Sequence, residues 1–218
     1  MKREIHTIKI NAINSKLKYM SELVSNQLEA AMIALSENNQ NLAEEIMEKD
    51  NEIDDLQKEI EEECIKFIAT EQPLAKDLRR VFTASKIVTD LERMADLTVD
   101  ICKIISNNDF KEFIEEANSV WEMEKEIKNM LHLSMEAYLE RDTRSAYDIC
   151  KLDDNIDLYY KEVFKNTLKY VKNNENKITL GTQILFISKY LERIGDHITN
   201  ICEWIIFSKT GEYVDLNE

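Results

Sequence analysis

The stretch DLERMADLTVDIC at residues 90–102 has a near copy, YLERIGDHITNIC, at residues 190–202. Leu, Glu, Arg, Asp, Ile and Cys recur in the same order without a gap, at an offset of 100 residues. A second, weaker match lies upstream, where EKDNEIDDLQKEI (48–60) aligns with CKLDDNIDLYYKEV (150–163) at an offset of 103 residues. Two matches in the same order indicate a duplicated unit of about 100 residues.

Apolar residues around the first copy follow the period of an α-helix. Steps of three and four residues place one apolar stripe on a single helical side, formed by Val88, Leu91, Ala95, Val99 and Cys102. The chain holds only three Gly and one Pro among 218 residues. Sheets and tight turns need more of both, whereas long helices need almost none. The fold class is therefore predicted to be all-α.

Clusters of Asn, Ser, Asp and Pro interrupt the helical pattern and predict where helices end. They divide the chain into six long helices, three in each duplicated unit, at roughly 7–36, 40–70, 74–105, 110–140, 144–172 and 178–208. Short connections make consecutive helices antiparallel neighbours. The predicted architecture is two tandem antiparallel three-helix bundles, residues 1–107 and 108–218.

Acidic residues lie beside the apolar stripes in pairs spaced four apart, so both members of a pair share one helical face. Such pairs repel, and their charge near a core is costly unless a partner offsets it. Divalent or trivalent metal ions favour carboxylate oxygen. If the second and third helices of each bundle pack together, their pairs converge into one site per half. The expected metal ligands are Asp50, Asp54, Glu92 and Asp96 in the first half, and Asp153, Asp157, Glu192 and Asp196 in the second.

The alternative for any single pair is a solvated acidic face with Lys and Arg partners. Recurrence in both halves favours metal. His197 has no counterpart in the first half, where Leu97 takes its place. A histidine beside an acidic cluster could ligate metal, but a surface or hydrogen-bonded residue is favoured here.

Composition limits the partners. The formal net charge is −15, with 43 Asp and Glu against 28 Lys and Arg. This acidic balance argues against nucleic-acid binding and predicts that the chain avoids anionic lipid. A local basic patch could still bind a partner. The four dispersed cysteines are expected to be buried free thiols. Without a secretory signal or a bilayer-length apolar run, we expect a cytoplasmic protein with no direct membrane insertion.

Two segments resemble the signatures of the PhoU family, bacterial regulators of phosphate uptake: LERIGDHITNI (191–201) and QPLAKDLRRVFTASKIVTDLERMAD (72–96). The resemblance covers nearly the whole chain. It implies two three-helix bundles, a tendency to form homodimers, and iron or zinc at repeated (E/D)xxxD motifs, with Mg or Mn as further possibilities. Those motifs fall on the eight carboxylates named above. Because Gly195 replaces Ala95, the two sites are expected to differ in occupancy.

The resemblance also implies a function without catalytic residues. It predicts a negative regulator that contacts the ATPase subunit of a phosphate ABC transporter and a sensor histidine kinase. Two alternatives remain: an accessory of another permease or a purely structural bundle, and a di-metal carboxylate oxidoreductase or metal store. Ferritin-like di-metal sites use Glu-x-x-His motifs. The residues three before each His are instead Arg3, Asn129 and Ile194, which weighs against that class.

Overall fold

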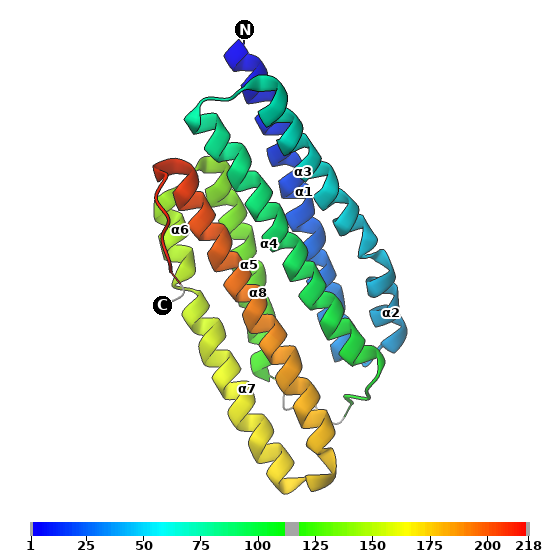
Figure 1. The fold of residues 1–218 in the computed structure, drawn as a ribbon. Helices are drawn as coiled ribbons and strands as arrows, with labels where there is room; N and C mark the ends of the chain where they lie inside the picture. Colours follow the sequence, from blue (N-terminus) through cyan, green and yellow to red (C-terminus); the bar gives the residue numbers. More distant parts are fainter. Residues whose placement is uncertain (1, 112–117, 217–218) are drawn as a thin grey trace.

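The computed structural model describes residues 2–111 and 118–216, and this part of the chain contains only helices and their connections (Figure 1). The first half forms α1 (Lys2–Ser36), α2 (Gln40–Lys49), α3 (Asn51–Glu71) and α4 (Ala75–Ser106). The second half forms α5 (Asn118–Glu140), α6 (Thr143–Cys150), α7 (Asp153–Asn173), the short 3₁₀-helix η2 (Glu175–Lys177) and α8 (Ile178–Thr210). The predicted all-α fold is confirmed.

Two of the six predicted helices are each broken into two pieces. The helix expected at 40–70 breaks at Asp50, and the helix expected at 144–172 breaks at residues 151–152. Asp50 keeps helical dihedrals (φ −59°, ψ −29°), so the chain passes from α2 to α3 without a loop. The breaks leave Asp50 just before α3 and make Asp153 the first residue of α7. Helix N-termini favour carboxylates, which suits both positions.

The connection between the halves is anchored by a buried aromatic ring. Phe110 is fully buried, and its backbone N–H donates to Asn38 Oδ1 at 2.7 Å in the turn after α1. Residues 110 and 111 lie in this connection rather than in a helix, so the helix start expected at 110 is wrong. Hydrophobic burial of one ring thus prevails over the helical pattern that continues in the sequence.

The two bundles pack side by side, with α4 against α8 at the centre and α1 against α5 beside them (Figure 1). Helices of both bundles therefore cover α4 and α8, and each carries buried residues around much of its circumference. A helix that is apolar on several sides belongs in a core. The expected apolar stripe is buried at Val88, Leu91, Ala95 and Cys102, whereas Val99 is only half-buried. None of the described helices is long and apolar enough to cross a bilayer.

A buried carboxylate joins the two central helices. Asp90 of α4 is only 9% exposed, and its Oδ1 accepts from Asn200 Nδ2 at 3.2 Å. The same oxygen lies 3.0 Å from Nδ1 of His197 on α8. Buried polar groups are stabilising only when they are hydrogen-bonded. The contacts of Asp90 with His197 and Asn200 therefore fix the position of α8 along the axis of α4. Of the two alternatives favoured for His197, a surface or a hydrogen-bonded residue, the structure shows the hydrogen-bonded one.

The cysteines are free thiols, as expected. Cys64, Cys102 and Cys202 are buried, and Cys150 is half-buried. Burial raises the pKa of the Cys64 and Cys102 thiols to about 12, which makes them inert side chains of the core at neutral pH.

The central packing predicts where the fold is most sensitive. Leu191→Ala, at a fully buried position of α8, should lower the free energy of unfolding by about 2–5 kcal/mol because it leaves a cavity between the bundles. Leu158→Ala, at a residue that is 57% exposed, should change it by less than about 0.5 kcal/mol. Urea denaturation followed by circular dichroism measures both, and equal effects would contradict the shared core.

Candidate metal centres

The first-half carboxylates converge between α3 and α4, as the sequence predicts. Burial is the main cause that raises the pKa of Asp50, and the carboxylates of Asp54 and Asp96 raise it further. An opposing contact comes from α1, where Gln27 Nε2 donates to Asp50 Oδ1 at 2.7 Å. The sequence carries no signal that Gln27 belongs to this cluster, because it lies on a helix without a carboxylate pair.

Glu92 is the most enclosed acid that α4 brings to this cluster, with 14% of its side chain exposed against 46% for Asp96. Burial raises its pKa, and Asp96, Asp54 and Asp50 add to the effect. Arg93 offsets part of the charge, since its Nη1 lies 2.8 Å from Asp96 and its Nε 3.5 Å from Glu92 Oε2. At 3.5 Å the second contact is an ion pair only, and the buried Oε2 has no hydrogen bond.

The second cluster forms between α7 and α8, and it contains the carboxyl group with the larger pKa shift. Asp153 has its pKa raised to about 7, first by burial and then by Asp196, Asp157 and Glu192. Its Oδ1 is buried without a hydrogen-bond partner. A buried acceptor without a donor is costly, so this oxygen is suited to a cation. Burial and the Glu192 carboxylate likewise raise the pKa of Asp196.

Two lysines form ion pairs with the outer carboxylates of the second cluster. Lys189 donates to Glu192 one turn along α8, and Lys161 Nζ lies 3.5 Å from Asp157 Oδ2. Both partners stand at spacings of three or four residues, which the sequence alone shows. Neither lysine reaches Asp153, so the innermost acid is the one left without a cation.

Gly195 explains why Asp153 can approach α8 so closely. A Cβ at this position would lie 2.6 Å from Asp153 Oδ1 and 2.9 Å from Ile156 Cδ1. Only glycine permits this contact without displacement of the carboxylate. The first half has Ala95 at the matching position. The two clusters therefore differ in how closely their first acid approaches the facing helix.

The structure brings all eight predicted residues into two clusters of four, and each cluster offers only carboxylate oxygens as donors. Hard cations suit such a set, and Zn²⁺ also accepts it. Within the described ranges, however, no three His, Cys, Asp or Glu side chains are already positioned as a ligand set. An ion bound by three or more of these residues would require their side chains to change position. Asp153 Oδ1 and Glu92 Oε2 both lack a hydrogen bond, and Glu92 Oε2 has only its ion pair with Arg93.

The structure is thus a duplicated helical bundle with one acidic cluster between two helices of each half. Comparisons with known proteins narrow this class. The sequence matches the PhoU domain twice, at residues 17–105 and 120–205. A phosphate-specific transport system accessory protein PhoU homolog from Clostridium acetobutylicum is 42% identical over the full length of both chains.

Solved structures agree with this assignment. The phosphate transport system regulatory protein PhoU from Streptococcus pneumoniae superposes with a TM-score of 0.90 at 31% identity, covering 96% of this chain and 99% of that one. PhoU from Pseudomonas aeruginosa gives a TM-score of 0.84 at 28% identity, covering 94% and 99%. The chain belongs to the PhoU family, which places it among the regulatory accessory proteins of phosphate transport.

The raised pKa of Asp153 predicts a pH dependence of stability in metal-free protein. The folded-state pKa of about 7 exceeds the unfolded value of about 3.9, so the native state binds the extra proton between these limits. The free energy of unfolding should therefore fall as pH rises from about 4 to about 7 and level off above. Asp153→Asn should flatten this decline and raise the melting temperature at pH 8.

The measurement is thermal unfolding of chelator-treated protein across this pH range. Asp154→Asn is the matched control, because it removes an exposed carboxylate one residue away on the same helix. That control should follow the wild-type curve. If the Asp153→Asn curve kept the wild-type slope, the raised pKa of Asp153 would not be the cause of the pH dependence.

Proposed function

We propose that this chain is a cytoplasmic adaptor that keeps the phosphate-starvation response off when phosphate is plentiful. In this role it contacts the ATPase subunit of a phosphate ABC transporter and a sensor histidine kinase, and it acts as a homodimer. The observation that carries the proposal is the full-length relationship to accessory proteins of phosphate-specific transport systems, which includes both repeats. Its four free cysteines, three of them buried, are compatible with a cytoplasmic setting.

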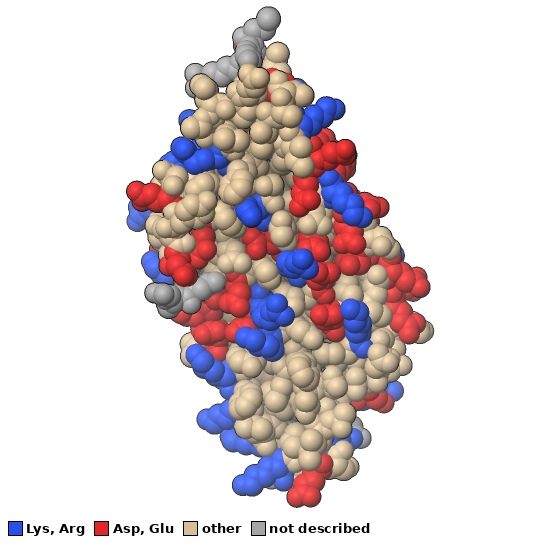
Figure 2. All heavy atoms as spheres, in the orientation of Figure 1, with Lys and Arg blue, Asp and Glu red and all other residues tan. Residues whose placement is uncertain are grey.

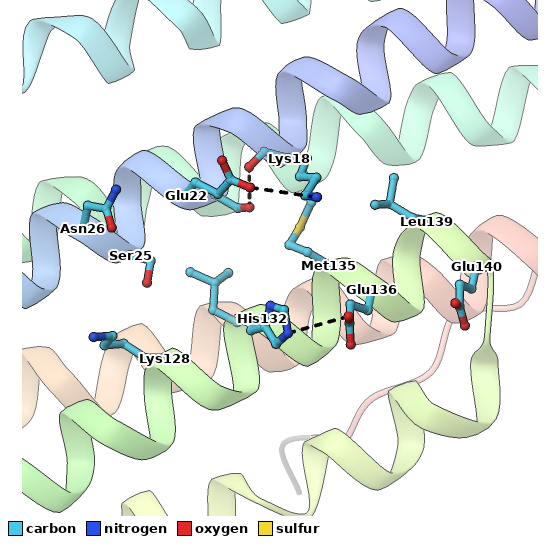
Figure 3. A pocket seen from close by; sticks show the side chains of 12 residues that line it. Lys18, Glu22, Ser25, Asn26, Lys128, His132, Met135, Glu136, Leu139 and Glu140 are labelled. Atoms are coloured by element: carbon cyan, nitrogen blue, oxygen red, sulfur yellow. Dashed lines mark hydrogen bonds and ion pairs between the residues drawn. The ribbon is translucent and has the colours of Figure 1, made fainter.

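A groove between α1 and α5 gives the proposed adaptor a surface that draws on both bundles. It has a volume of about 550 Å³ and an apolar side that includes Leu131, Met135 and Leu139. Figure 3 shows charged side chains along it, with Lys18 facing Glu22 and His132 facing Glu136. An amphipathic helix of a partner fits such an apolar groove with a charged rim.

The proposal assigns metal ions to the two carboxylate clusters, with iron or zinc first and Mg or Mn as alternatives. An ion in the second cluster would be held by Asp153, Asp157, Glu192 and Asp196, and one in the first by Asp50, Asp54, Glu92 and Asp96. The ion would supply the positive charge that lets these acids stay ionised near the core. Because each cluster takes acids from two helices, bound metal would tie α3 to α4 and α7 to α8.

The alternative, a di-metal oxidoreductase or metal store, gains no support from the histidines. His197, the histidine next to the second cluster, has its Nδ1 on Asp90 of the other bundle. His132 and His6 lie on α5 and α1, outside both clusters. None of the three histidines follows a Glu at the Glu-x-x-His spacing that ferritin-like sites use.

The metal assignment predicts a specific loss. Glu192→Ala combined with Asp196→Ala should remove the metal of the second cluster, measured by elemental analysis of protein purified without chelator and reloaded with iron or zinc. Glu44→Ala with Glu48→Ala is the matched control, since this exposed pair on α2 has the same spacing and lies in neither cluster. Unchanged metal in the first variant, or equal loss in both, would refute the site.

The adaptor role predicts recovery of named partner classes. Tagged protein should retain the phosphate transporter's ATPase subunit or a sensor kinase from its own cell lysate, including solubilised membranes. Leu139 is a 40% exposed residue of the α1–α5 groove, and Leu139→Glu should lower that recovery because the bound partner would bury the new charge. Leu74 is 82% exposed and lies outside the groove, so Leu74→Glu should not lower it. Recovery of neither partner, with iron bound and oxygen-dependent turnover, would favour the oxidoreductase instead.

A further inference from the structure

The hairpin of α7 and α8 exposes large apolar side chains at the end of the molecule that lies lowest in Figure 1. Leu168 is 52% exposed and Phe164 44%, and they stand one helical turn apart on α7. Ile178, 56% exposed, begins α8. The two helices are in close contact here, because a Cβ at Gly181 would lie 2.4 Å from Val171. This surface, Phe164, Leu168 and Ile178, is called the apolar tip below.

Lysines run along α7 beside the apolar tip. Lys161, Lys165, Lys169 and Lys172 are all exposed and recur at steps of three and four residues, so they form one stripe on the outer side of the helix. Residues 158–180 contain five Lys and only two Glu, in a chain whose net charge is −15. Figure 2 shows the lower end of the molecule as mostly tan, with Lys and Arg side chains along its left edge and acidic atoms at its lowest point.

The first half shows that the fold itself does not require this charge pattern. The matching hairpin of α3 and α4 also exposes apolar side chains, including Ile65 and Ile68. Residues 55–80, however, contain seven Asp and Glu against five Lys and Arg. Duplicated structure with opposite local charge points to a partner that meets only the second hairpin.

We propose that the α7–α8 tip docks on an anionic lipid surface. Phe164, Leu168 and Ile178 would enter the boundary between headgroups and acyl chains, while the lysines keep their charged ends at the phosphates. The acidic remainder of the chain is repelled by the same surface, so the molecule would stand on this end. The avoidance of anionic lipid that the net charge predicts would then apply to the rest of the chain and not to this hairpin.

Exposure and pairing favour lipid over an acidic protein. The three apolar side chains are about half exposed and therefore project outward instead of lining a groove for a partner's helix. In the described ranges, Lys165, Lys169 and Lys172 form no ion pair, which leaves their charges free for phosphates. Docking of this kind needs no membrane-spanning segment.

The test is sedimentation of the full-length protein with protein-free vesicles. Vesicles of phosphatidylcholine with phosphatidylglycerol should bind it, vesicles of phosphatidylcholine alone should not, and added salt should weaken binding. Lys165→Glu, Lys169→Glu and Lys172→Glu together should lower the partition coefficient at least tenfold. The same three changes at Lys58, Lys66 and Lys76 in the first hairpin alter the net charge equally at exposed sites and should have a much smaller effect.

The apolar contribution is tested separately. Phe164→Ser with Leu168→Ser should lower vesicle binding about tenfold, whereas Ile65→Ser with Ile68→Ser should not. All four residues are exposed, so circular dichroism and the melting temperature should remain those of the wild-type protein. Failure to bind anionic vesicles, or equal loss in the two charge variants, would overturn the proposal. So would lysine-dependent binding that appears only when vesicles carry membrane protein, because the partner would then be an acidic protein.

Discussion

The packing of α4 against α8 is the contact on which the rest of the structure depends. Each helix belongs to one bundle, yet each is covered by both, so the cores of the two repeats are continuous. Asp90, held by His197 and Asn200, fixes the alignment of the two helices with directional bonds that apolar packing alone does not provide. Because α4 and α8 also carry Glu92 and Glu192, the same contact positions one half of each carboxylate cluster.

The carboxylate clusters show how a duplicated unit can diverge without losing its fold. In the first half, Gln27 and Arg93 already satisfy part of the acidic charge. In the second, Gly195 admits Asp153 against the helix backbone, where no base reaches it. Burial then dominates, and the pKa of Asp153 rises further than that of its counterpart. Gly195 in place of alanine is thus one of the differences that let Asp153 lie closer to the facing helix than its counterpart does.

Surface charge diverged in the same way. The repeats share helices, breaks and apolar hairpin ends, while the charge around those ends has opposite sign. Net charge averages over this difference, which is why a whole-chain value is a poor guide to a single surface. In the proposed adaptor, these two similar ends with different charge would meet two different environments.

The sequence by itself determined the all-α fold, the duplication and the membership of the clusters, because helical periodicity and four-residue spacing are local properties that need no tertiary information. Only the tertiary structure decided the helix breaks at Asp50 and before Asp153, the burial of Phe110 in the connection, and the contribution of Gln27. Each of these depends on which helix lies opposite. The same is true of the depth of Asp153, since desolvation is set by neighbours that are distant in the chain.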